Sequence, residues 1–121
     1  MKTPLQYKNL INELDLDQIK TENIDPADVK QSISHLMEIQ NQLKNTEISL
    51  NMDIHALRSQ YQGRIKSLSI NPHHKPRVEE EQRVQDERDA KLAPYEEVKN
   101  QIQTLIEETS KRLAMLEKNQ A

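Results

Sequence analysis

The sequence has no cysteine, no phenylalanine and no tryptophan, and only one glycine among its 121 residues. The missing cysteines exclude disulfides, thiolate chemistry and cysteine-ligated zinc sites. A buried aromatic side chain fills roughly 150 to 250 Å² of a compact core. Because three tyrosines are the only aromatic residues, we do not expect a thick globular centre. Long helices joined along thin seams suit this composition, and disorder is the alternative.

Long apolar runs are also missing from the chain. No stretch approaches the ~20 apolar residues that a membrane-spanning helix needs, and the first residues, MKTPLQYKNLINELD, hold no apolar run of signal-peptide length. The net charge of -3 is too small to indicate a general affinity for nucleic acids. We therefore expect one soluble, cytoplasmic domain over residues 1–121, without membrane association.

Helix-start signals predict a short first helix and a long second one. Thr3 and Pro4 suit the cap and first position of a helix over about 4–14. Residues 15–25 mix apolar and acidic side chains without a period and are expected to be a linker. Asp25 and Pro26 then open a helix over about 26–70, in which leucine recurs every seven residues at positions 36, 43, 50 and 57.

A returning third helix is predicted over about 77–118. Asn71 and Pro72 end the second helix because the residue before a proline is pushed out of the helical region. The third helix has its own apolar stripe, which includes Val84, Leu92, Tyr95, Val98, Ile102, Ile106, Leu113 and Leu116. Pro94 lies inside this helix, where it costs about 3 kcal/mol, so we expect a kink or break near residue 94.

The two stripes can be tested against each other, since facing residues of an antiparallel hairpin have a nearly constant index sum. A sum of 149 pairs Leu36 with Leu113 and Leu43 with Ile106, and it places Gln40 opposite Thr109. The same sum centres the turn within NPHHKP, at residues 71–76. The sequence therefore predicts an all-α fold: a long, coiled-coil-like antiparallel helical hairpin with a short N-terminal helix. An intermolecular coiled coil through the same leucines stays open.

Several apolar residues do not fit the seam between the two long helices. The N-terminal helix could cover some of them, but one short helix cannot cover a long rod. We therefore expect a surface for protein partners or for self-association, with a homodimer as the simplest result. Its candidate residues are Tyr7, Leu10, Ile11, Leu14, Met37, Ile48 and Met52.

The predicted hairpin tip is basic. Its candidate contact residues are Arg64, Lys66, His73, His74, Lys75 and Arg77. They face the acid-rich segment 79–97, so mutual neutralisation is the simpler interpretation. The alternative is an arm that binds an anionic ligand or nucleic acid. Without aromatic residues at the tip, base stacking is excluded, and nucleic acid is not the favoured partner. Two adjacent histidines do not supply the three or four converging ligands of a metal site, so no metal is expected.

No catalytic motif is visible in the sequence. It contains neither a glycine-rich phosphate loop nor an HExxH motif, and a thin rod offers no enclosed site. We expect no enzyme activity and no cofactor. The sequence is typical of a non-catalytic adaptor, scaffold or assembly factor that acts through helix-surface contacts with partner proteins and with itself.

Overall fold

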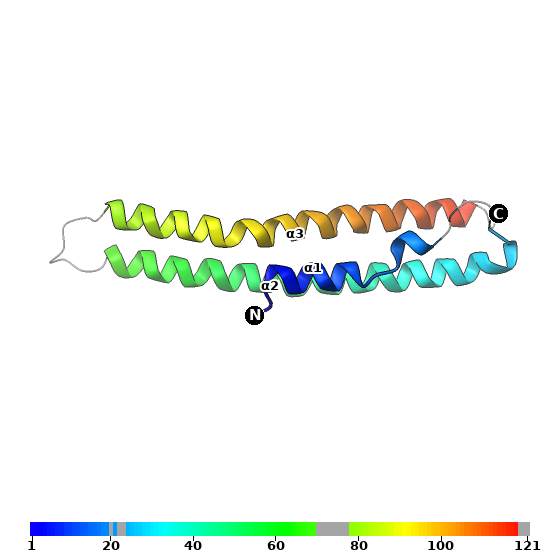
Figure 1. Ribbon diagram of the computed structural model, residues 1–121, viewed down its shortest axis with the longest axis horizontal. Coiled ribbons are helices and arrows are strands. Elements are labelled where there is room, and N and C mark those ends of the chain that lie inside the picture. The colour runs from blue at the N-terminus through cyan, green and yellow to red at the C-terminus, as the bar shows by residue number, and fades with distance from the viewer. Residues whose placement is uncertain (20, 22–23, 70–77, 119–121) are drawn as a thin grey trace.

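The computed structural model describes residues 1–19, 21, 24–69 and 78–118. Its elements follow in the order α1 (Pro4–Asn12), the 3₁₀ turns η1 (Leu16–Gln18) and η2 (Pro26–Asp28), α2 (Val29–Ser69) and α3 (Val78–Lys118). Helices α2 and α3 lie side by side along a rod, and α1 lies along one half of it (Figure 1). At 1.5 Å per residue, each 41-residue helix is about 61 Å long. The predicted all-α hairpin with a short N-terminal helix is confirmed.

The first helix and the turn before the second begin at the capping residues that the sequence predicts. The Thr3 hydroxyl accepts a hydrogen bond from the Gln6 backbone N–H at 3.2 Å, and the Gln6 side chain accepts one from the Thr3 N–H at 2.8 Å. Asp25 accepts one from the Ala27 N–H ahead of α2. These bonds satisfy N–H groups that have no partner within the helix, and so they fix where the helices begin. The predicted turn at 71–76 lies outside the described residues.

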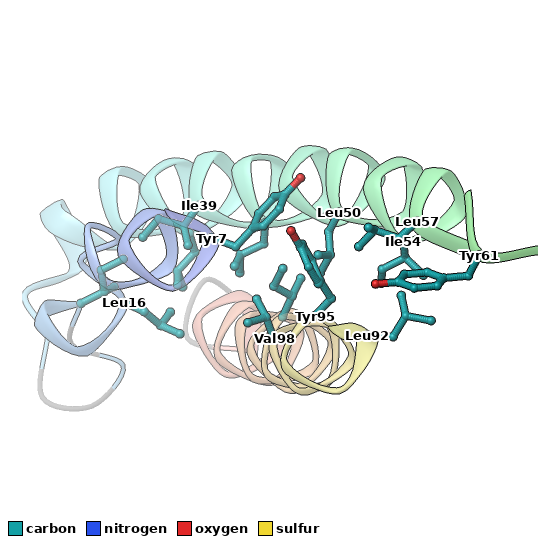
Figure 2. Close-up of a cluster of buried hydrophobic side chains, with 14 of the residues drawn as sticks. Tyr7, Leu16, Ile39, Leu50, Ile54, Leu57, Tyr61, Leu92, Tyr95 and Val98 are labelled. Carbon is teal, nitrogen blue, oxygen red and sulfur yellow. The ribbon is translucent and has the colours of Figure 1, made fainter. Parts of the chain in front are cut away.

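The seam between α2 and α3 is a single apolar layer with one polar interruption (Figure 2 shows much of this layer). Leu36, Leu43 and Leu50 are fully buried on α2. The Gln40 amide donates to the Thr109 hydroxyl at 3.1 Å, and that hydroxyl donates to the Ile106 carbonyl at 2.7 Å. The contact between Gln40 and Thr109 confirms the predicted register, and it leaves the buried Thr109 side chain satisfied.

Helix α3 continues through Pro94 without interruption, so the predicted break does not occur. Proline removes one backbone N–H, which frees the carbonyl one turn earlier, at Ala90. Both Pro94 and Ala90 are exposed. Water can therefore solvate the freed carbonyl, and the helix tolerates the proline.

The N-terminal segment covers only one half of the hairpin. The Lys2 N–H donates to Asp53 at 3.2 Å, the Tyr95 hydroxyl donates to the Lys2 carbonyl at 2.8 Å, and Arg112 donates to the Leu16 carbonyl at 2.6 Å. These contacts run α1 in the direction of α3 and opposite to α2 (Figure 1). We call the half covered by this segment, 29–53 and 95–118, the proximal half. The remainder, 54–69 and 78–94, is the distal half.

Candidate interaction surfaces

Three large apolar side chains are exposed along the outer face of α2. Met37, Ile48 and Met52 are 53%, 60% and 68% exposed. With 3.6 residues per turn, they fall within about 60° of one another, and the stripe runs about 22 Å along the helix. The buried leucines of the seam occupy the opposite side of α2. We call Met37, Ile48 and Met52 the α2 stripe.

The sector of α2 that holds the stripe contains no acidic residue. Among the residues of α2, the only acids are Glu38, Glu47 and Asp53, and the helical spacing places all three outside the stripe's sector. Lys44 lies about 20° outside the edge of that sector, one turn before Ile48. The stripe is therefore an apolar surface beside a positive charge.

Tyr7, in contrast, belongs to the internal core. Its side chain is fully buried, its hydroxyl donates to Asp53 at 2.5 Å, and the same hydroxyl lies 3.0 Å from the Ser49 hydroxyl. The Tyr7 and Tyr95 rings meet edge to face, with centroids 6.4 Å apart (Figure 2). Burial, together with the Asp53 carboxylate, raises the pKa of Tyr7 to about 12. Tyr7 therefore cannot contact a partner while α1 is docked, which corrects its assignment to an open surface.

Of the other predicted contact residues in the N-terminal segment, some pack against the core and one is exposed. Ile11 and Leu14 are half-buried and pack against the core, whereas Leu10 is 37% exposed. Ile39, which does not fit the predicted seam, is buried near this segment. Helix α1 thus covers part of the apolar surface left over from the seam, but it does not reach the α2 stripe.

Two of the described arginines near the tip already have carboxylate partners. Arg64 forms two hydrogen bonds to Glu87, each 3.2 Å long, and its guanidinium lies 5.3 Å from the centre of the Tyr61 ring. Arg58 pairs with Glu96 across the two helices, and Lys66 is also engaged by a neighbour. Mutual neutralisation therefore accounts for this part of the tip. His73, His74, Lys75 and Arg77 lie outside the described residues.

Several surface hollows lie along the described part of the rod, and two of them adjoin the predicted surfaces. One, of about 860 Å³, lies in the distal half and reaches Glu97 and Asn100; Leu92, Ala93 and Glu96 are part of its wall. Another, of about 570 Å³, lies beside the N-terminal segment and is lined mainly by apolar side chains such as Ile39, Leu43 and Leu105. Over the described part of the chain, no group of three histidine, aspartate or glutamate side chains could hold a metal ion. None of the described helices is long and apolar enough to cross a membrane.

Comparison of the chain with protein-family models, with curated proteins and with solved structures finds no match. Its function therefore has to be argued from the surfaces described above.

Proposed function

We propose that this chain is a non-catalytic helical interaction protein, an adaptor, scaffold or assembly factor, that contacts partner proteins and a second copy of itself. The observation that carries the proposal is the exposure of Met37, Ile48 and Met52 on one face of α2. Burying a side chain of this size stabilises a complex by roughly 1.5 to 3 kcal/mol relative to leaving it in water. Three of them on one face favour a contact that removes them from solvent.

The described helices do not supply that contact within one copy. Helix α1 is held on another side of α2 by Asp53 and Ser49, so it cannot also cover Met52. Helix α3 packs against the seam side. The occupant of the α2 stripe therefore comes from a second molecule, and the proposal includes a homodimer as the simplest assembly.

The elongated shape supports an interaction role as well. A rod of two long helices presents extended faces to its partners, and its hollows are open to solvent. The proposal needs neither a cofactor nor a metal ion, and it places the protein in the cytoplasm, where cysteine-free helical chains need no disulfide support. We do not extend it to an anion-binding tip, because Arg58 and Arg64 already bind carboxylates.

Self-association of the purified chain tests the proposal. Sedimentation velocity over a wide range of concentrations is expected to show reversible association of the wild type. Met52→Glu is expected to weaken it at least tenfold, because a carboxylate would have to be buried with the stripe. Gln60→Glu is the matched control: it adds the same charge at an exposed position of α2 outside the stripe, and it should leave association unchanged.

A wild-type chain that stays monomeric at the highest attainable concentration would contradict the proposal. So would equal effects of the two substitutions, since the stripe would then have no special part in the contact. Circular dichroism of each variant shows whether the helices are intact.

A further inference from the structure

The outer face of α3 carries acidic side chains, which the α2 stripe lacks. Asp86, Asp89, Glu97 and Glu107 are all exposed, and their spacing places them within about 80° of one another on the side of α3 away from the seam. Ala93 lies in the middle of this sector and is also exposed. We call these five residues the α3 acidic face.

Ala93 borders the larger of the two hollows. The hollow has a volume of about 860 Å³, and its wall includes Leu92, the ion pairs Arg58–Glu96 and Arg88–Asp89, and Glu97. The short alanine side chain leaves space there, and Leu92 contributes an apolar wall next to Glu97. A methionine or isoleucine side chain entering this hollow would find apolar contact, and a neighbouring lysine would find the Glu97 carboxylate.

The α2 stripe presents that combination of groups. Met52 and Ile48 are its most exposed members, and Lys44 lies one turn away from Ile48 on the same face. Packing two α2 stripes against each other would instead bring two copies of Lys44 together with no acid in the sector. Charge therefore favours a contact between α2 of one copy and α3 of another.

We infer that a second copy of this chain docks its α3 acidic face on the α2 stripe, with Met52 entering the hollow beside Ala93 of the neighbour. The inference rests on the proposed self-association and specifies its two surfaces, and it replaces the homodimer of the simplest assembly with a series of copies. Because the two faces differ, the contact is head-to-tail: each copy uses α2 toward one neighbour and α3 toward the other.

Helix α1 leaves both faces accessible. It contacts α2 through Ser49 and Asp53 and α3 through Tyr95, and these residues belong to neither face. A copy with α1 docked can therefore bind neighbours on both edges of the rod at once. Self-association should then continue beyond a dimer as concentration rises, unless the assembly closes into a ring.

Two variants that each block one face separate this arrangement from the alternatives. Met52→Glu blocks the α2 stripe through repulsion by the α3 acidic face. Ala93→Lys blocks the α3 acidic face, since its long side chain fills the hollow that Met52 would enter. Both positions are exposed, and circular dichroism and thermal unfolding of each variant check that the hairpin is intact.

Sedimentation velocity on the full-length variants gives the readout. Each variant alone is expected to associate at least tenfold more weakly than the wild type. An equimolar mixture is expected to form a one-to-one complex that grows no further, because the free α2 stripe of one variant fits the free α3 acidic face of the other. High salt should weaken both this complex and wild-type assembly.

Other outcomes would overturn the inference in distinguishable ways. If Ala93→Lys alone associates like the wild type while Met52→Glu does not, the stripe pairs with itself, and only the inferred arrangement fails. If the mixture contains no more complex than the separate variants, the two faces do not meet. If the wild type is monomeric throughout, the proposed self-association fails together with the inference.

Discussion

Removing one oxygen atom from Tyr7 tests how α1 is held on the hairpin. The Tyr7 hydroxyl donates to the Asp53 carboxylate and lies 3.0 Å from the Ser49 hydroxyl, while the ring is fully buried. In Tyr7→Phe the ring and its packing remain, but the hydrogen bonds are lost. A hydrogen bond to a charged acceptor contributes about 1.5 to 3 kcal/mol. At about 1.4 kcal/mol per factor of ten, α1 docking should weaken roughly ten- to a hundredfold.

The effect should be local, because α1 rests on the outside of a hairpin that has its own buried seam. Native-state amide hydrogen exchange measures this directly. Protection of residues 4–12 is expected to fall by the factor given above, while the amides around Leu43 and Ile102 keep theirs. Tyr61→Phe is the matched control, since Tyr61 is a buried tyrosine in the distal half, away from α1.

Two results would refute this reasoning. Unchanged protection of residues 4–12 would mean that the hydroxyl does not help to hold α1. An equal loss of protection along α2 and α3 would mean that α1 and the hairpin unfold as one cooperative unit, so that α1 is not an attached element.

Three further predictions concern other parts of the molecule. Gly63→Ala should raise the free energy of unfolding in urea by about 1 kcal/mol, because alanine favours a helix interior and an added Cβ at this position meets nothing within 4 Å; a loss of stability would contradict that account. Thr109→Val should cost up to about 1 kcal/mol in thermal unfolding, because the Gln40 amide loses its acceptor at 3.1 Å and keeps only Ser110 at 2.9 Å, and adding Gln40→Leu should recover most of that cost. A double variant less stable than Thr109→Val alone would show that the polar pair is not the reason. Burial raises the pKa of Tyr7 from 10.0 to about 12. The neutral Tyr7 hydroxyl therefore stabilises α1 docking fully below pH 10, and this contribution should be lost as the pH rises through about 12. An NMR titration should show release of α1 near pH 12 in the wild type, and this step should be absent in Tyr7→Phe. Ionisation of Tyr7 near its ordinary pKa would refute the link between Tyr7 ionisation and α1 docking.

The hairpin could be predicted from the sequence because two independent apolar stripes had to agree on one register. Gln40 and Thr109 satisfy the predicted index sum with a direct hydrogen bond. The exposure of Met37, Ile48 and Met52 also follows from helical spacing, since these residues lie away from the seam leucines. Their role as a contact surface stays a prediction.

The docking of α1 could not be predicted in the same way. Spacing shows which side of a short helix is apolar, but it does not show which helix that side meets or in which direction. Tyr7 finds its partner Asp53 46 residues away. One signal was present in α2: Leu36, Ile39 and Leu43 follow at intervals of three and four residues, which widens the apolar face beyond a single seam.

A kink or break was predicted near Pro94 because proline in a helix interior costs about 3 kcal/mol. Part of that cost is the lost hydrogen bond to the carbonyl one turn earlier, and water can replace this bond where the carbonyl is exposed. In the structure, Ala90 and Pro94 both lie on the exposed side of α3. Sequence alone does not reveal this, because exposure at these two positions depends on how α3 is rotated against α2.

The position of α1 also makes the rod mechanically uneven. Where three helices are bonded together, bending has to stretch and compress side chains across a wider cross-section, and so the proximal half resists it. The distal half has only two helices and a single seam, so it yields first to a sideways load. A force applied near the tip would therefore flex the distal half about a stiff base, close to the level of Asp53 and Tyr95, where the N-terminal segment makes its first bonds (Figure 1).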